Sequence, residues 1–370
     1  MQEHVGYLSD AVRNERFRRA IAQVMQPGDV VVDLGCGFGV LGLMCLEQGA
    51  ARVWGIDQTE AVEIARQSAA RTGYADRYHC LRETTFRAAL PEPADIAICD
   101  HVGWFGLDYG IAAMTADARA RMLRPGGTVV PGKITLIVAG VTSPSARELA
   151  EAWTAPEMPT EFRWLRDYSI NTKHPYTFER DMVVTEPVAL GTVDLNADIA
   201  DSLSFKAELT AQADGALDGL GGWFDCEIVP GISMTNSPLA PDPISRNQVF
   251  LAFDQPMAVS AGDTVAVTVS LRHESGTLAW TVRNLRSGEM ARQTTWRSQI
   301  LAEADLAKPA ERVPRVGRLG AARRLVLDYA DGVRTSAEIE DLILRDHPGL
   351  LPTEAEARRF IRSELLRNER

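Results

Sequence analysis

The sequence is poor in cysteine and carries no cysteine pattern that would hold a metal or a disulfide framework. Its five cysteines are odd in number and include no Cys-x-x-Cys pair, so we expect buried thiols in a reducing compartment. They are Cys36, Cys45, Cys80, Cys99 and Cys226. A His-Glu-x-x-His motif is also missing, and we assign no metal. The nucleophile elbow Gly-x-Ser-x-Gly of α/β-hydrolases does not occur either.

Long apolar runs and an excess of basic residues are lacking too. No apolar run approaches the roughly 18 residues of a membrane-spanning helix, and the first residues show neither the basic start nor the apolar segment of a signal peptide. We therefore expect a soluble cytoplasmic protein with no membrane partner. Lys and Arg number 39 against 50 Asp and Glu, a net charge of −11, which argues against nucleic acid as the main partner.

Residues 1–131 alternate between apolar strand-like runs and helix-spaced runs. The expected strands are 29–34, 52–56 and 95–99, and the expected helices are 10–25, 41–48, 60–72 and 113–122. Such alternation is typical of a parallel sheet covered by helices. We therefore predict a Rossmann-like α/β domain over residues 1–131.

Residues 132–300 have a different pattern, with short strand-like runs separated by Gly, Pro, Asn and Asp. The expected strands are 135–138, 182–188, 201–209, 223–228, 249–253, 264–271 and 279–282. This pattern predicts an antiparallel β-barrel or sandwich. A partly helical tract at about 143–176 interrupts it.

The last residues, 309–370, form a third region after a proline-flanked linker at 309–314. Helix-spaced apolar residues occur at 321–330, 336–345 and 353–367, and two of these helices begin with a hydroxyl-x-x-acid capping pattern at Thr335 and Thr353. We predict a small helical module, of winged-helix or peptide-recognition type.

A glycine-rich corner provides the first functional signal. Gly35, Gly37 and Gly39 follow a strand and leave room for backbone to approach a ligand, and Asp57, about 20 residues beyond, suits a ribose diol. The dinucleotide spacing Gly-x-Gly-x-x-Gly is absent because Val40 stands at its third glycine. The pattern fits S-adenosyl-L-methionine better, with Asp33 facing the ligand's ammonium end or holding the loop.

Further motifs make residues 4–295 resemble the protein arginine methyltransferase family. The matching segments are 4–13 (His-x-x-Tyr-Leu-x-Asp-x-x-Arg), 33–37 (Asp-Leu-Gly-Cys-Gly), 55–57 (Gly-Ile-Asp), 99–104 (Cys-Asp-His-Val-Gly-Trp) and 123–131 (Leu-Arg-Pro-Gly-Gly-Thr-Val-Val-Pro). The resemblance implies S-adenosylmethionine as cofactor, with Arg13 pairing with its carboxylate and 99–104 opening the substrate loop. It also implies a homodimer formed through an arm in 143–176.

The departures from that family bear on the acceptor. Two substrate-loop glutamates of the family fall on Asp100 and Tyr109, and its barrel Thr-His-Trp signature falls on 244–246 (Ile-Ser-Arg). Its adenine-facing glutamate falls near Phe86, with Glu83 a possible substitute. One short carboxylate and one phenol lack the charge to grip a guanidinium fork. We therefore expect that the cofactor is kept and the acceptor changed.

These comparisons lead to a set of candidate site residues. The cofactor residues are Arg13, Asp33, Gly35, Gly37, Asp57, Gln58 and Glu83. The catalytic residues are Asp100, His101 and Tyr109, and the acceptor-binding residues are Trp104, Ser245 and Arg246. Asp100 and His101 follow a central strand, where ligands bind in open α/β sheets, and are expected to orient or deprotonate the acceptor. For His101 a packing role is the alternative.

Three functions stay open at this point. The first is a methyltransferase acting on a non-arginine group of a peptide or protein, as in natural-product tailoring. Residues 325–339 resemble the helical part of small domains that recognise ribosomal peptides, and a helical lid or dimer piece is the alternative for this module. The second is a small-molecule methyltransferase, and the third is a cofactor-binding scaffold without turnover.

Overall fold

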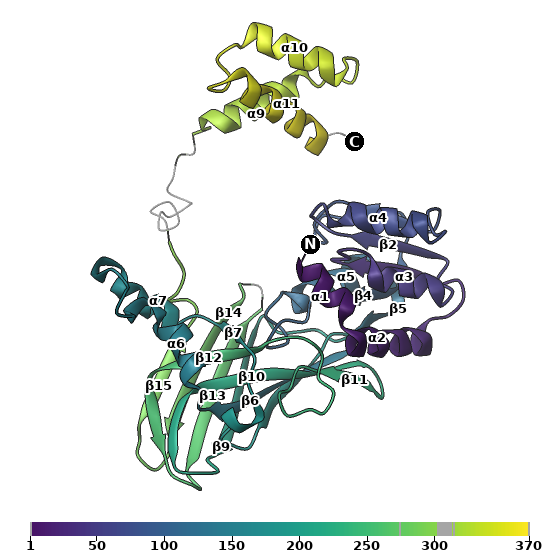
Figure 1. Cartoon of the computed structure of the whole chain (residues 1–370). Helices are drawn as coiled ribbons and strands as arrows, with labels where there is room; N and C mark the ends of the chain where they lie inside the picture. Colours follow the sequence, from purple (N-terminus) through teal and green to yellow (C-terminus); the bar gives the residue numbers. More distant parts are fainter. Residues whose placement is uncertain (1, 274, 302–312, 314, 369–370) are drawn as a thin grey trace. The chain divides into compact units, whose positions relative to one another are not determined.

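A computed structural model describes residues 2–273, 275–301, 313 and 315–368 (Figure 1). The chain divides into two compact units, one ending at Gln299 and the other beginning at Ile300. The first unit contains the α/β sheet and the antiparallel strands, and the second contains helices.

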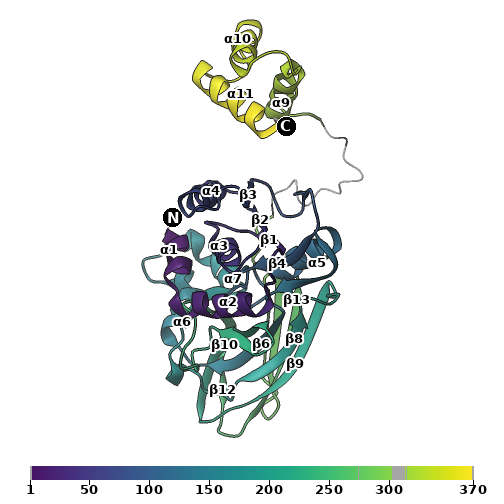
Figure 2. The same cartoon turned by 90° about the vertical axis from the view of Figure 1, so that its right-hand side faces the viewer.

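The parallel sheet has the strand order β3-β2-β1-β4-β5. Its strands are β1 (Val30–Leu34), β2 (Arg52–Ile56), β3 (Tyr78–Leu81), β4 (Ala94–Cys99) and β5 (Leu123–Val130). The helices around it are α1 (Gln2–Ser9), α2 (Ala11–Val24), α3 (Val40–Glu47), α4 (Ala61–Arg71) and α5 (Ile111–Arg121). Helices α3 and α5 lie to either side of β1 and β4 in Figure 2. The chain order reverses between β1 and β4, which is where ligands bind in such sheets.

Antiparallel strands form the rest of the first unit. One sheet has the order β7-β12-β10-β6-β8, with β11 paired to β10, and the other has the order β15-β14-β13-β9. The strands are β6 (Lys133–Val141), β7 (His174–Tyr176), β8 (Val188–Asp194), β9 (Ser202–Thr210), β10 (Gly215–Val229), β11 (Ile232–Thr235), β12 (Gln248–Val259), β13 (Thr264–Arg272), β14 (Thr277–Asn284) and β15 (Met290–Thr294). Side chains of β13 alternate between buried and half-buried, as expected for a sheet with one inner face. The buried Trp280 of β14 donates its indole N–H to the Ala252 carbonyl of β12, which joins the two sheets.

The fold class expected from the sequence is confirmed, with local corrections. The expected strand at 182–188 is wrong, because Arg180–Met182 forms a 3-10 turn (η3) and β8 begins only at Val188. Strand β10 runs over 15 residues and begins well before the expected strand at 223. Its first half is rich in glycine, a residue depleted in strands, and this concealed it. Strands β3, β7, β11 and β15 were not expected.

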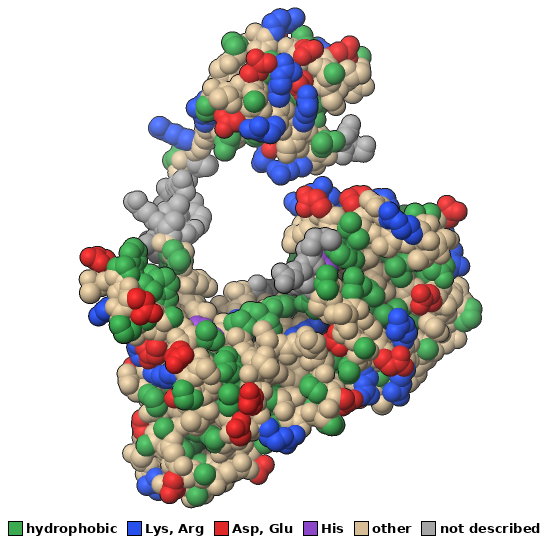
Figure 3. Space-filling view, viewed as in Figure 1, with side chains coloured by type: hydrophobic (Ala, Val, Ile, Leu, Met, Phe, Trp, Pro, Cys, Tyr) green, Lys and Arg blue, Asp and Glu red, His purple; other side chains and the backbone are tan. Residues whose placement is uncertain are grey.

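The tract that interrupts the barrel projects from it as a small helical arm (Figure 1). It contains α6 (Pro144–Glu151), η1 (Ala152–Thr154), η2 (Thr160–Leu165) and α7 (Arg166–Ile170). Arg166 bonds Glu151 at 2.6 Å and Asp254 of β12 at 2.7 Å, which fixes the arm to the barrel. Phe162 and Trp164 are 50% and 60% exposed, and Figure 3 shows hydrophobic side chains gathered over this segment.

The second unit has a helical core of its own. Helices α9 (Arg318–Tyr329), α10 (Ser336–Asp346) and α11 (Glu354–Asn368) bury Val326, Ile339, Ile343, Ile361 and Leu365 together. The expected capping at Thr335 is confirmed. The Thr335 hydroxyl accepts from the Glu338 N–H, and the Glu338 carboxylate accepts from the Thr335 N–H. Within its described residues, 313 and 315–368, this unit contains no strand. The expected linker at 309–314 lies mostly outside the described residues.

Candidate active site and cofactor pocket

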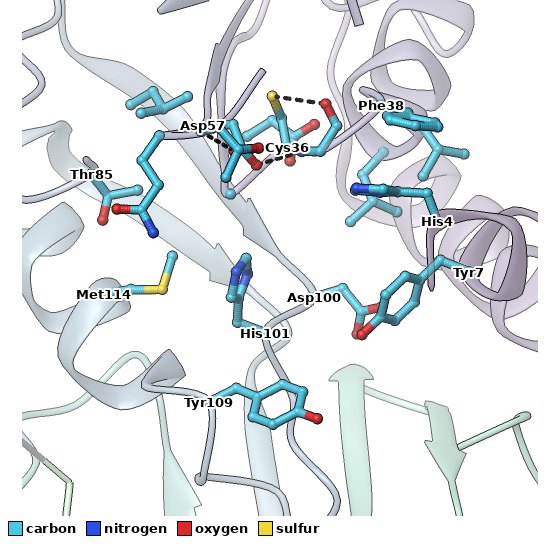
Figure 4. Close-up of a pocket in the computed structure, with 18 of the residues that line it drawn as sticks. His4, Tyr7, Cys36, Phe38, Asp57, Thr85, Asp100, His101, Tyr109 and Met114 are labelled. Carbon is cyan, nitrogen blue, oxygen red and sulfur yellow. Dashed lines mark hydrogen bonds between the residues drawn. The ribbon is translucent and has the colours of Figure 1, made fainter. Parts of the chain in front are cut away.

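A cavity of about 440 Å³ lies at the carboxyl ends of β1, β2 and β4 (Figure 4). Its lining comes from α1, the corner between β1 and α3, the residues that follow β2, β3 and β4, and α5. This volume is in the range of small-molecule and cofactor sites. The sheet therefore places the candidate cofactor residues and the candidate catalytic residues around one cavity.

The glycine corner is fixed by positive φ angles and by close neighbours. Gly35 has φ +64°, and a Cβ there would lie 1.9 Å from Cε1 of His101. Gly37 has φ +53°, and its N–H donates to the Asp57 carboxylate at 3.0 Å. Asp57 also accepts from the N–H and the hydroxyl of Thr59. The corner thus requires glycine at these positions and holds the Asp57 carboxylate at the cavity.

Asp33 lies beneath the corner and holds it. It accepts from the Gly42 N–H at 3.0 Å and the Tyr78 hydroxyl at 3.3 Å. Burial raises the pKa of Asp33 to about 7, although these hydrogen bonds and the charge of Arg13 work in the opposite direction. Of the two roles expected from the sequence, holding the loop is the one that these contacts support.

Helix α1 covers one side of the cavity. His4 stacks on Phe38, with 4.0 Å between ring centroids, and Tyr7 follows one turn later. Both line the cavity, as Figure 4 shows. Asp10 caps the next helix by accepting from the Arg13 N–H at 3.0 Å. The motif at 4–13 therefore folds into a cover followed by a capped helix that delivers Arg13.

Asp100 forms a buried charge cluster with two arginines. Its carboxylate lies 2.5 Å from Nε of Arg13 and 3.1 Å from a terminal nitrogen of Arg246, and Arg246 also donates to the Val102 carbonyl at 2.6 Å. The three charged side chains are only 4–6% exposed. Burial alone would raise the pKa of Asp100, but the guanidiniums of Arg246 and Arg13 outweigh it and hold that pKa below its usual value. A carboxylate stabilised in this way is a weak base.

His101 and Tyr109 line the same side of the cavity (Figure 4). The His101 ring faces the glycine corner, and its Nδ1 lies 3.6 Å from the Cys99 sulfur. Tyr109 is 36% exposed, and Trp104 packs edge-on against it, with 5.6 Å between the ring centroids. The cavity therefore places an imidazole and a phenol beside the Asp100 cluster.

Comparison with known proteins identifies the chemistry. A family model described as "Methyltransferase domain" matches residues 31–127. Protein arginine N-methyltransferase 1 of Saccharomyces cerevisiae is 27% identical over 273 residues, which cover 71% of this chain and 78% of that protein. Protein arginine N-methyltransferase 1 of Dictyostelium discoideum is 27% identical over 62% of this chain and 68% of its own length.

Solved structures agree on the fold. The Trypanosoma brucei PRMT1 enzyme-prozyme heterotetrameric complex with AdoHcy matches with a TM-score of 0.69 and 23% identity, over 79% of this chain and 96% of that one. Arabidopsis thaliana protein arginine methyltransferase 10, in an open conformation, matches with a TM-score of 0.68 and 18% identity, over 80% and 98%. This chain is an S-adenosylmethionine-dependent methyltransferase of protein arginine methyltransferase-like architecture. The cofactor and the enzyme class expected from the sequence are confirmed.

All seven expected cofactor residues of this methyltransferase lie at the cavity. Arg13, Asp33, Gly35, Gly37, Asp57, Gln58 and Glu83 all line it. Glu83 accepts from the Thr84 N–H at 2.8 Å and from Arg87, and the first of these bonds lowers its pKa most. Sequence reasoning did not assign Phe38, Thr85 and Met114, which also line the cavity. Single residues without a charge or a motif, such as these, give no signal in the sequence.

The expected acceptor-binding residues of the methyltransferase are placed differently from the cofactor residues. Trp104, Ser245 and Arg246 do not belong to the cavity lining. Trp104 packs edge-on against Tyr109. The backbone N–H of Ser245 donates to the Asp10 carboxylate at 2.8 Å. Arg246 instead forms an ion pair with the buried Asp100 carboxylate at 3.1 Å.

Two further expectations concern metals and membranes. Within the part of the chain that the structure describes, no three His, Cys, Asp or Glu side chains gather as a metal site would require. No described helix is both long and apolar enough to cross a bilayer. All five cysteines are free and buried.

Proposed function

We propose that this methyltransferase acts on a non-arginine acceptor in a peptide or protein. The observation that carries the proposal is the Asp100 cluster. Asp100 stands at one of the two positions where the resembling family has acids for arginine, and here it already bonds two guanidiniums of its own chain. The other position is Tyr109, a phenol that carries no charge near neutral pH. A third guanidinium would compete for a carboxylate that is already neutralised.

The residues of the cavity fit S-adenosylmethionine at its other end. The glycine corner leaves backbone open to a ligand, and the Asp57 carboxylate, fixed by Gly37 and Thr59, is suited to a ribose diol. Arg13 is placed to attract the carboxylate of the amino-acid tail, as the resemblance implies, and Glu83 is the candidate for the adenine side. When bound, the cofactor supplies the methyl group, while the protein positions the acceptor and excludes water.

The second unit is proposed to hold a peptide that carries the acceptor. A groove of its own is lined by α9 and the segment after α10, with Arg318, Leu325, Asp328 and Leu350 among its residues. Tethering a peptide would raise the local concentration of the acceptor, so that the catalytic cavity itself need bind only weakly. A role in natural-product tailoring follows from this proposal.

The proposal includes a homodimer and a cytoplasmic location. The exposed Phe162 and Trp164 of the projecting arm form an apolar surface that a second copy could cover. Free, buried cysteines suit a reducing compartment. A monomer in sedimentation analysis would contradict the dimer.

The experiment that tests the proposed function has two stages. Calorimetry first measures binding of S-adenosylmethionine to the wild type, to Asp57→Ala and to the control Asp76→Ala, whose side chain is exposed. Only Asp57→Ala is expected to lose affinity, by tenfold or more. Mass spectrometry then follows peptides co-expressed with the enzyme, where a methylated residue other than arginine is expected. Methylation confined to arginine would refute the acceptor assignment.

A further inference from the structure

The Asp100 cluster, of which Asp100 and Arg13 line the cavity and Arg246 lies outside its lining, contains more positive than negative charge. Asp100 contributes one negative charge, and Arg13 and Arg246 contribute one positive charge each. All three side chains are nearly inaccessible to water, so their charges are screened far less than those at the surface. The cluster as a whole therefore carries one net positive charge beside His101 and Tyr109. The carboxylate of the cofactor tail that Arg13 is proposed to attract is accompanied by the ammonium of the same tail, so the tail as a whole does not cancel this charge.

The other carboxylates that line the cavity do not offset this charge at the acceptor side. Asp33 bonds Gly42 and Tyr78 beneath the glycine corner, and its raised pKa leaves it largely neutral in mildly acidic solution. Asp57 bonds Gly37, and Glu83 pairs with Arg87 beyond β3. Among the described residues of the lining, each carboxylate is thus already engaged. A cationic acceptor would be repelled both by the sulfonium of the donor and by the positive charge of this cluster.

We infer that the methyl acceptor is a carboxylate, an inference that rests on the proposed function. A carboxylate is attracted both by the excess positive charge of the Asp100 cluster and by the sulfonium. One acceptor oxygen forms the new C–O bond while the methyl C–S bond breaks and its electron pair passes to sulfur. The products are a methyl ester and S-adenosylhomocysteine. No proton has to be removed, which agrees with an Asp100 that is held ionised by two guanidiniums.

His101 and Tyr109 are the groups placed to orient this carboxylate. Both line the cavity next to Asp100, and each has a hydrogen-bond donor at its tip (Figure 4). Hydrogen-bond donors at this place can align an anionic oxygen, which has no proton to lose. Arg246 acts through its charge and through Asp100, so it is a positioning residue.

The test uses the full chain, S-adenosylmethionine labelled at its methyl group, and three peptide pools with the same neutral flanks. The pools differ at the central position, which is Asp or Glu, Arg or Lys, or Ser or Gln, and all termini are blocked. Transfer to the acidic pool is expected, and mild alkali should release its label as volatile methanol. Label that survives alkali is not a methyl ester and contradicts the inference.

Each other outcome separates the inference from the proposed function. Transfer to the Ser and Gln pool overturns the carboxylate but leaves a non-arginine acceptor. Transfer to arginine overturns both. Transfer to no pool overturns the inference that the acceptor is a carboxylate. Calorimetric binding of S-adenosylmethionine then tests the cofactor site independently.

A pair of variants tests the charge itself. Arg246→Lys keeps the positive charge, whereas Arg246→Gln removes it and leaves Asp100 with Arg13 alone. We expect Arg246→Gln to raise KM for the acidic pool by tenfold or more while S-adenosylmethionine affinity changes little, and Arg246→Lys to restore most of it. Equal KM values in the two variants would overturn the role of the charge.

Discussion

The Asp100 cluster makes a strong prediction about stability. Asp100→Asn keeps the volume of the side chain but removes its charge, so that Arg13 and Arg246 remain buried without their carboxylate. Each ion pair is worth about 4 kcal/mol at an effective dielectric constant of 20 before desolvation is subtracted. Removing one partner of a buried pair typically costs about 3–5 kcal/mol. We expect a loss of that size in the free energy of unfolding.

Urea unfolding followed by circular dichroism measures this loss, and a control variant calibrates it. Asp242→Asn removes the carboxylate that pairs with Arg16 on the surface, where the two side chains are 30% and 52% exposed. Such a pair is worth about 1 kcal/mol or less. If Asp100→Asn destabilises the protein no more than Asp242→Asn does, the reasoning about the buried cluster is refuted.

The pH dependence gives a second readout of the same perturbation. The pKa of Asp100 is lower in the folded protein than its usual value of about 4. Its ionised form therefore stabilises the fold above that usual value, and this contribution disappears as the pH falls through the folded pKa. Asp100→Asn has no such contribution to lose. The difference between wild type and variant should thus shrink in acid, and a constant difference would contradict the assignment.

Three further predictions concern the corner, its buried acid and the second unit. Gly35→Ala should lower S-adenosylmethionine affinity in calorimetry by tenfold or more because its Cβ would meet His101, whereas Gly28→Ala, at φ +98° with open space around it, should retain affinity. The pKa of Asp33 is raised to about 7, so the wild type loses stability as the pH rises from about 4 through 7, and Asp33→Asn should show a smaller loss in urea unfolding between pH 5.5 and 8. A chain ending at Gln299 should keep cofactor affinity but show a sharply higher KM for a peptide acceptor, and an unchanged KM would count against the tether.

The sequence predicted the parts of the site that depend on local geometry. The glycine corner and Asp57 could be located because a tight strand-to-helix turn needs glycine and because an acid must follow at a fixed distance. The two helix caps of the second unit were found in the same way, through a spacing of three residues. Such signals depend on a fixed spacing along the chain, so they can be recognised in the sequence without knowledge of tertiary contacts.

The parts that the sequence could not place depend on contacts between distant residues. Arg246 was assigned to acceptor binding, yet it pairs with Asp100, which lies 146 positions earlier. Nothing near Arg246 in the sequence shows that its barrel loop reaches the carboxyl end of β4. Likewise no strand forms over 182–187, because Val183 and Thr185 make only isolated bridges, to Val141 and Ala211, before β8 begins at Val188. Such pairing with distant residues is not visible in the local sequence.

The charge cluster also connects the two ends of the cavity. Tyr7 of α1 has the guanidinium of Arg13 at 5.6 Å and that of Arg246 at 5.4 Å from its ring centroid. Arg13 belongs to the helix that is expected to hold the cofactor's tail, and Arg246 belongs to the barrel. A negative charge that attracts Arg13 would weaken its hold on Asp100 and leave Arg246 as the main partner of that carboxylate. On the proposed function, cofactor and acceptor share one set of charges, and we expect binding of the first to change the electrostatic environment that the second encounters.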